Sequence, residues 1–171
     1  MSGMLCYASY DQKRADYPGV VIPRLVELAF KAAKRKPVEL RTWLAGFGLD
    51  LDRSGATVRE LSLLHHAARG GRYRVNYPLH CERFQPVETT LAEGGDCDQW
   101  AVVLMAVLFA WGVPVTFVGA GDDLDPFQHV YVRAYANGWY TLDPKPDQRG
   151  EEFDQTTFAQ TTVLFPLEVT A

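Results

Sequence analysis

The stretch GGDCDQWAVVLMAVLFAWGVPVTFVGAG, residues 94–121, decides the fold of this chain. From Asp98 to Trp111 it is apolar nearly all round, which is typical of a buried helix rather than a surface helix. Gly112 and Pro114 supply the signals that end the helix, and the VTFVGAG that follows is typical of a strand. The stretch therefore predicts a helix inside the core and a strand directly after it.

A β-hairpin is predicted downstream of this stretch. QHVYVRAYA (128–136) alternates strongly, Asn137-Gly138 is a turn pair, and WYTLDP (139–144) supplies the returning strand. The segment VLFPLEV (163–169) is expected either to add an edge strand or to dock on the core.

Three shorter helices are predicted upstream. Pro23 suits the first turn of one helix, and Pro37 restarts a second helix over roughly residues 38–45. Thr57-Val-Arg-Glu60 reads as a capping box that begins a third helix ending near Arg69. This order predicts an α+β fold, in which N-terminal helices and a central buried helix pack on an antiparallel sheet.

Length and charge restrict the class of protein. The 171 residues suit a single domain, 1–171, with a helical part (1–71), a core (72–146) and a C-terminal tail (147–171). Lys plus Arg number 17 and Asp plus Glu number 21, and the formal net charge of −4 argues against a nucleic-acid partner. The apolar run 101–111 is too short to span a bilayer, and the N-terminus lacks the pattern of a Sec signal. We therefore expect no membrane partner and no Sec-dependent secretion.

The three cysteines, Cys6, Cys81 and Cys97, are an odd number at wide spacing, which is a poor disulfide framework. No pair has the CxxC spacing of a zinc site. We expect neither a metal nor another cofactor, and a reduced compartment is the simpler interpretation.

Cys97 falls at the start of the predicted buried helix. Asp96 is a good N-cap because its carboxylate accepts N–H groups of the first turn, and the same terminus favours a thiolate on Cys97. A nucleophile also needs a base and a group that orients the base. His129 on one strand of the hairpin and Asp143 on the next are the candidates.

Three blocks in this order, GDCD before an apolar helix, HVYV on a strand and WYTLDP after a turn, resemble the core of the transglutaminase-like superfamily. The resemblance covers about residues 72–146 and is to short microbial and phage-type members, without a calcium loop or flanking β-domains. It implies a papain-like fold with Cys97 as nucleophile, His129 as general base and acid, and Asp143 as the orienting carboxylate. It also suggests a role in a phage particle or its assembly.

The turn of the hairpin decides whether His129 and Asp143 share one face of the sheet. A two-residue loop at Asn137-Gly138 would place Asp143 on the face away from His129. A three-residue loop, 136–138, would place it diagonally from His129 on the same face. Because the two side chains must touch, we predict the three-residue loop, with a helical backbone at Asn137, positive φ at Gly138 and a His129–Asp143 hydrogen bond.

An acyl-transfer site also needs donors for the oxyanion. The backbone N–H of Cys97 is the natural first donor. Gln85, in RFQPVETTL, is the candidate for the second, and Tyr77 is a weaker alternative. The competing interpretation of Gln85 is a loop residue that bonds its own backbone.

Two charged segments each allow two interpretations. The acidic loop with Asp122, Asp123 and Asp125 either selects a cationic substrate group or, as we favour, is simply solvated. The basic run KAAKRK (31–36) is either a patch for an anionic partner or, as we favour, a solvated helix end.

The residues predict a cysteine hydrolase or acyltransferase that forms an acyl-enzyme on a peptide or protein substrate. Hydrolysis, as in a protease or amidase, is favoured over cross-linking because water is always present. The alternative is a catalytically silent structural or binding protein of the same fold, such as a phage virion or assembly component. The expected location is cytoplasmic or virion-associated.

Overall fold

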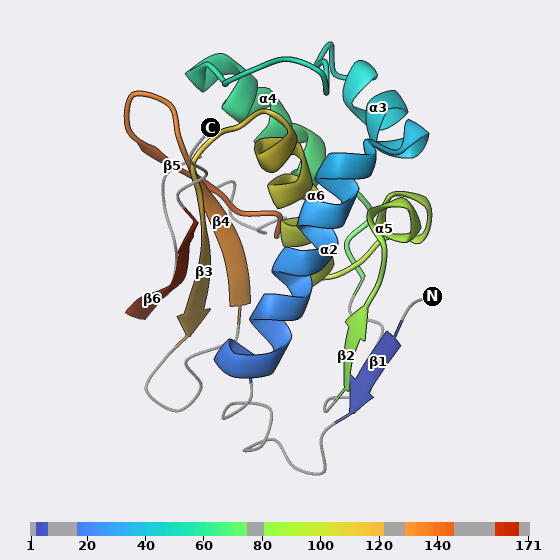
Figure 1. Cartoon of the computed structure of the whole chain (residues 1–171), viewed down its shortest axis with the longest axis vertical. Helices are drawn as coiled ribbons and strands as arrows, with labels where there is room; N and C mark the ends of the chain where they lie inside the picture. The colour runs from blue at the N-terminus through green and yellow to red at the C-terminus, as the bar shows by residue number, and fades with distance from the viewer. Residues whose placement is uncertain (1–2, 7–16, 75–80, 122–128, 146–159, 168–171) are drawn as a thin grey trace.

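The computed structural model describes residues 3–6, 17–74, 81–121, 129–145 and 160–167, and the fold they form is α+β (Figure 1). The helices are η1 (Tyr17–Val21, a π-helical turn), α2 (Ile22–Arg35), α3 (Val38–Ala45), α4 (Val58–Arg69), α5 (Val87–Glu93) and α6 (Cys97–Ala110). The strands are β1 (Gly3–Cys6), β2 (Cys81–Phe84), β3 (Val115–Gly121), β4 (His129–Tyr135), β5 (Trp139–Leu142) and β6 (Gln160–Leu167).

Helix α6 forms the centre of the molecule. It lies between the larger sheet and α2, and it contacts both β4 and α2 (Figure 1). Every residue from Asp98 to Leu108 is buried. This confirms the prediction from the apolar run, because a helix with apolar residues on all sides can only be stable when covered on all sides. Within the described ranges, none of the helices has the length and apolar character needed to cross a membrane.

The larger sheet is antiparallel, with the strand order β5-β4-β3-β6. Strand β6 pairs with β3 at the edge, as the sequence allowed, but it spans residues 160–167 rather than 163–169. Its pairing with β3 shifts register between Phe117 and Val118, which marks a bulge or irregularity there.

The β4–β5 hairpin has the predicted three-residue loop. Tyr135 pairs with Trp139, so the loop is 136–138. Gly138 has the predicted positive φ, at 155°, but the prediction for Asn137 was wrong: its φ is 61°, in the left-handed region. Asn and Gly both tolerate that region, so the sequence alone did not say which of them would adopt it.

The three upstream helices match their predicted positions. Pro23 lies in the first turn of α2, and α3 covers residues 38–45. Helix α4 begins with the predicted capping box, in which Thr57 and Glu60 each bond the other's backbone N–H. A capping box thus marks the start of α4, whereas α2 and α3 begin beside a proline without a side-chain cap.

Four elements escaped the sequence analysis: η1, β1, β2 and α5. Helix α5 follows Pro86 directly, and β1 pairs with β2 in a small separate sheet. In that pairing the backbone of Cys6 lies opposite that of Cys81, so two cysteines far apart in sequence share one register position. The strand expected in YRVNYPL is described only up to residue 74, where Tyr73 forms an isolated bridge with Gly95. Residues 75–80, the acidic loop at 122–125 and most of the tail lie outside the described ranges.

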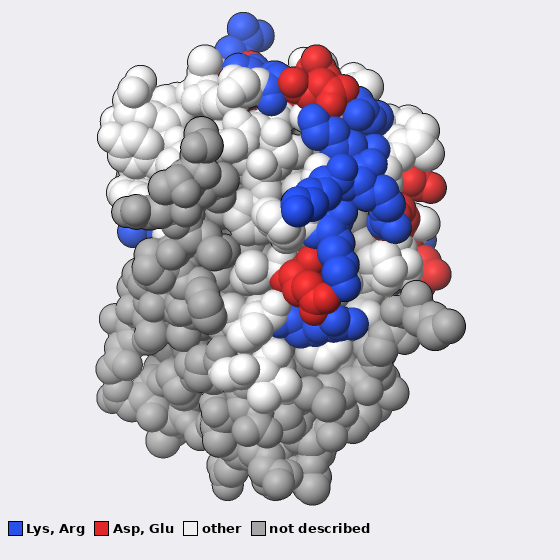
Figure 2. All heavy atoms as spheres, in the orientation of Figure 1, with Lys and Arg blue, Asp and Glu red and all other residues white. Residues whose placement is uncertain are grey.

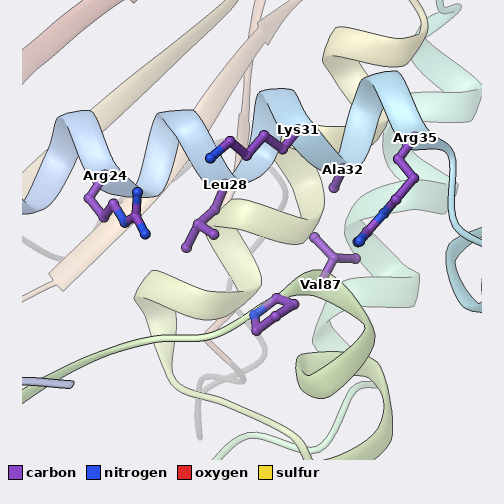
Figure 3. Close-up of a pocket in the computed structure, with 7 residues that line it drawn as sticks. Arg24, Leu28, Lys31, Ala32, Arg35 and Val87 are labelled. Atoms are coloured by element: carbon purple, nitrogen blue, oxygen red, sulfur yellow. The ribbon is translucent and has the colours of Figure 1, made fainter. Parts of the chain in front are cut away.

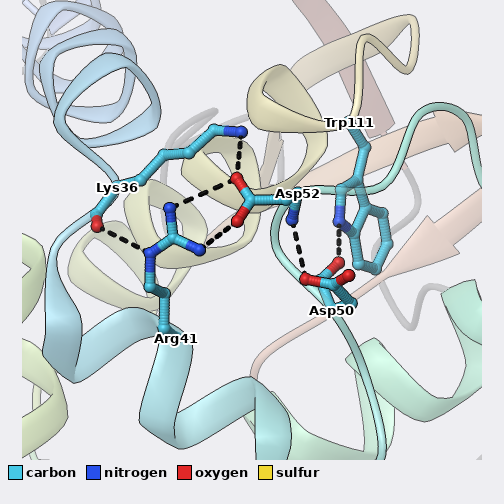
Figure 4. Close-up of polar contacts among 5 residues, drawn as sticks. All are labelled: Lys36, Arg41, Asp50, Asp52 and Trp111. Carbon is cyan, nitrogen blue, oxygen red and sulfur yellow. Dashed lines mark hydrogen bonds and ion pairs between the residues drawn. The ribbon is translucent and has the colours of Figure 1, made fainter.

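The C-terminal end of α6 is tied to the loop between α3 and α4 (Figure 4). The Trp111 indole N–H donates to the Asp50 carbonyl at 2.8 Å, and the Gly55 N–H donates to the Trp111 carbonyl at 2.7 Å. In the same loop, hydrogen bonds from Arg41 and Lys36 lower the pKa of Asp52 to about 2. The end of the buried helix is thus held by bonds from a loop far away in sequence.

Candidate active site

His129 and Asp143 come together on the hairpin. His129 is the first residue of β4 and only 2% exposed, while Asp143 directly follows β5. The His129 Nε2 lies 2.7 Å from the Asp143 Oδ1, as the register predicted. The Lys145 backbone N–H also donates to Asp143 Oδ1, at 2.9 Å, which fixes the carboxylate.

This contact determines which nitrogen of His129 can do chemistry. A carboxylate accepts hydrogen bonds, so Nε2 carries the proton that Asp143 receives. In the neutral ring, Nδ1 is then the acceptor that can take a proton from a nucleophile. Tyr131 stacks beside the imidazole with ring centroids 6.1 Å apart and further restricts its orientation.

A second histidine supports Asp143 from α4. His65 is buried, and its Nε2 lies 2.9 Å from the Asp143 backbone carbonyl. Because a carbonyl only accepts, Nε2 of His65 must be the donor. Burial lowers the pKa of His65 below its usual value, which favours the neutral ring. The sequence alone did not indicate this link between His65 and Asp143.

Cys97 is the first residue of α6 and is half-buried. Asp96 is the N-cap, as predicted, and accepts a hydrogen bond from the Asp98 N–H at 3.2 Å. Gln99 completes a capping box by accepting the Asp96 N–H at 2.9 Å. The Cys97 thiol lies 3.8 Å from the Asp98 carboxylate, toward which it donates. The two aspartates therefore have different tasks: one caps the helix and the other contacts the thiol.

The two glycines before this cap are required by close backbone approaches. Gly94 has φ of 90°, and a Cβ there would lie 2.3 Å from the Arg72 carbonyl oxygen. A Cβ on Gly95 would lie 2.7 Å from the Gln99 Cβ. Larger residues would therefore displace either the segment at Arg72 or the capping box that positions the cysteine.

Gln85 is buried next to this turn. Its Nε2 donates to Thr90 Oγ1 at 2.8 Å and to the Gly94 carbonyl at 3.0 Å, so both amide hydrogens are in use. Its Oε1 has no hydrogen-bond partner among the described residues. In this geometry Gln85 holds the turn that leads to the cysteine, and donation to an oxyanion would require one of those bonds to be released. Tyr77, the weaker alternative, lies outside the described residues.

Tyr73 is a site residue that the sequence analysis missed. Its hydroxyl hydrogen-bonds to Cys97, and burial, with a smaller contribution from Cys97, raises the pKa of the phenol. Its segment is fixed by the Arg74 N–H donating to the Gly95 carbonyl at 2.8 Å. The tyrosine was visible in a strand-like segment, but only the pairing with Gly95 brings it beside the thiol.

The order of elements places Cys97 and the His129–Asp143 pair at the same end of the core. Strand β3 follows α6 after a short turn and runs back along it, and β4 is antiparallel to β3. Strand β4 therefore runs in the same direction as α6, which it contacts. Both begin at one end of this layer, with Cys97 and His129 as their first residues.

No cluster of three or more metal-ligating side chains occurs among the residues that the structure describes. The Cys97 thiol and the Tyr73 phenol lie beside each other, and the His129 imidazole bonds the Asp143 carboxylate at the same end of the core. Comparisons of the chain with protein-family models, curated proteins and solved structures return no match.

Proposed function

We propose that this chain is a transglutaminase-like cysteine hydrolase or acyltransferase with a papain-like fold, acting on a peptide or protein. The observation that carries the proposal is the 2.7 Å contact between His129 Nε2 and Asp143 Oδ1, at the end of the core where α6 begins with Cys97. A nucleophile, a base and a group that orients the base are the parts that acyl transfer through a covalent intermediate needs.

In the proposed mechanism, His129 Nδ1 takes the proton of the Cys97 thiol. The sulfur attacks the carbonyl carbon of an amide, and the carbon–sulfur bond forms as the oxygen becomes an oxyanion. The imidazolium then gives its proton to the leaving nitrogen as the carbon–nitrogen bond breaks, which leaves a thioester. Water, activated by His129, attacks the thioester carbonyl. The carbon–sulfur bond then breaks, the carboxylic acid product leaves and the thiol is regenerated. Hydrolysis is favoured, and an amine in place of water would give transamidation.

The oxyanion has three candidate donors. The Cys97 backbone N–H lies at the helix terminus, where such groups point away from the helix. The Tyr73 hydroxyl is beside the sulfur, and its raised pKa keeps it protonated and able to donate. Gln85 remains a candidate only if one of its two present bonds is exchanged. We favour Cys97 and Tyr73 because their donors already lie at the thiol.

A catalytically silent protein of the same fold, such as a virion or assembly component, is the second candidate. One observation favours it: the Cys97 thiol donates toward the Asp98 carboxylate at 3.8 Å. A carboxylate next to a thiol stabilises the protonated, unreactive form. If the protein is an enzyme, substrate binding and proton transfer to His129 break the contact between the thiol and Asp98. If the protein is catalytically silent, the contact persists and the thiol stays protonated.

Reaction with p-nitrophenyl acetate separates the two candidates. An active site should release nitrophenol in a burst of one equivalent per chain, with one acetyl group on Cys97 by intact-mass and peptide analysis. The Cys97→Ser variant should fold normally and show no burst, since serine is similar in size. Methylamine can be added to detect transamidation. Accumulation of N-methylacetamide at the expense of acetate would show that the amine replaces water as the acyl acceptor. Absence of a burst from correctly folded protein would favour the silent interpretation.

A further inference from the structure

A groove lies between α2 and the start of α5 (Figure 3). It has a volume of about 450 Å³, within the range typical of binding sites. Its walls carry three cationic side chains, Arg24, Lys31 and Arg35. Its apolar surface comes from Leu28, Ala32, Pro86 and Val87. The groove therefore combines positive charge with apolar contact area.

The helical repeat explains why these residues share one wall. Positions 24, 28, 32 and 35 follow one another at steps of four, four and three residues, and position 31 lies three after 28 and four before 35. All five therefore lie on one face of α2. Eleven residues at a rise of about 1.5 Å separate the two arginines, which puts their backbone positions about 16 Å apart. Figure 3 shows Arg24 and Arg35 toward the two ends, with Leu28 and Ala32 between them and Val87 across the groove.

Positive charge is concentrated on this face. Six of the chain's 17 Lys and Arg residues, but only two of its 21 Asp and Glu residues, lie between residues 24 and 41. Figure 2 shows them as a continuous blue stripe with small red areas. A chain with a formal net charge of −4 thus carries a basic surface on one side. This charge distribution favours binding of an anionic partner at this face rather than elsewhere on the surface.

The cations are oriented by weak ion pairs. Glu27 accepts hydrogen bonds from Arg24 and Lys31, and Glu88 accepts from Arg35. The side chains of Lys31 and Arg35 are 64% and 62% exposed. Solvent screens an exposed ion pair, so a ligand carboxylate can share or replace Glu27, which is itself 43% exposed, at little cost. Glu88 is only 25% exposed, so the ligand shares Arg35 with Glu88 rather than displacing it.

We propose that the groove binds an acidic peptide segment of a partner protein. The segment is extended over about five residues, at about 3.3 Å each, to span the distance between Arg24 and Arg35. Its carboxylates contact the arginines and Lys31, and an apolar side chain between them packs on Leu28 and Val87. A peptide fits better than a nucleic acid, because the middle of the groove is apolar where a phosphate backbone needs charge. This function is additional to acyl transfer and does not depend on it.

Fluorescence anisotropy with a short labelled peptide, Glu-Glu-Leu-Ser-Glu-Glu, tests the proposal at low salt. Lys31→Glu should weaken binding about fivefold. Lys34→Glu is the matched control, because it makes the same charge change on the same helix at a residue that does not line the groove, and it should weaken binding less than about twofold. Cys97→Ser should bind like the wild type, which separates this proposal from the proposed catalysis.

Peptide variants test the same contacts without altering the protein. Replacing leucine by glycine, or every glutamate by glutamine, should each weaken binding about fivefold or more. Equal losses in Lys31→Glu and Lys34→Glu would overturn the proposal, since binding would then follow overall charge. The proposal would also be overturned if duplex DNA bound more tightly than the peptide and displaced it. Self-association of the chain that is abolished by Lys31→Glu would likewise overturn it.

Discussion

The two ends of α6 differ in the role of their polar groups. At the C-terminal end, the Trp111 indole and carbonyl bond the backbone of a distant loop, at 2.8 and 2.7 Å (Figure 4). At the N-terminal end, Cys97 contacts groups that can exchange protons, Asp98 and Tyr73. His129, which bonds Asp143, is the first residue of β4, and β4 contacts α6.

This difference suggests that one end of α6 serves mainly stability and the other end serves the proposed chemistry. Bonds to backbone groups cannot titrate in the physiological range, so the C-terminal end contributes mainly to the free energy of unfolding. Thiol, imidazole and carboxylate groups respond to pH and to substrates, so the N-terminal end is suited to catalysis. Substitutions at one end should therefore change acylation, and substitutions at the other should change stability.

The largest expected effect comes from replacing the base. His129→Gln should lower the rate of Cys97 acetylation by p-nitrophenyl acetate about 10²–10⁴-fold, because no group remains to accept the thiol proton. The matched control is His66→Gln, the same substitution at an exposed neighbour of His65. If both variants react at the wild-type rate, His129 has no part in the chemistry.

Loss of the orienting carboxylate should have a smaller effect. Asp143→Ala removes a charge-assisted hydrogen bond worth about 1.5–3 kcal/mol, so acetylation should slow about tenfold to 100-fold. In the His129→Gln background the same change should do little, since Asp143 acts through the imidazole. Additive losses in the double variant would show that Asp143 works independently of His129.

At the other end of α6, Trp111→Phe should reduce stability and leave chemistry intact. The change removes a part-buried hydrogen bond to the Asp50 carbonyl and leaves a gap where the buried indole packed, a loss of about 1–3 kcal/mol in the free energy of unfolding. Trp139→Phe is the control: Trp139 is 43% exposed and should lose less than about 0.5 kcal/mol. Denaturant unfolding measures both. A slower acetylation by folded Trp111→Phe would show that the two ends are coupled.

The smallest effect concerns pH. Burial lowers the pKa of His65 in the folded protein, so the unfolded chain binds a proton more readily. The stabilisation from neutral His65 is therefore complete above the unfolded pKa of about 6.5 and is lost as pH falls through the lowered folded value. His65→Gln keeps a donor for the Asp143 carbonyl but cannot titrate. The free energy of unfolding should then fall less steeply below about pH 6.5 than in the wild type or His66→Gln; an unchanged slope would exclude His65 as the cause.

The sequence predicted the elements whose boundaries are set by local chemistry. The capping box of α4, the proline at the start of α2 and the all-round apolar pattern of α6 each act within a few residues. The hairpin register was predicted because only one loop length puts His129 and Asp143 on the same face. These signals were sufficient for the α+β class and for the contact between His129 and Asp143.

Most features that the sequence missed depend on contacts that reach beyond the few residues of a cap or a turn. Strand β1 is defined only by its pairing with β2, more than seventy positions away. Tyr73 reaches Cys97 only through the bridge to Gly95. Gln85 was chosen as a donor for an oxyanion, yet its amide bonds Thr90 and Gly94, which no local pattern reveals. Local patterns thus located the residues proposed as nucleophile, base and orienting carboxylate, but not the groups that surround them.

The rate of iodoacetamide alkylation at Cys97 as a function of pH tests the central claim most directly. Peptide mass analysis gives the rates of all three cysteines in one sample, with Cys6 and Cys81 as internal references. If the N-terminal end of α6 is a catalytic site, Cys97 should react much faster than both, with a midpoint below about 8.5 that rises in His129→Gln. Equal, slow alkylation of the three cysteines in folded protein, unaffected by His129→Gln, would contradict the claim.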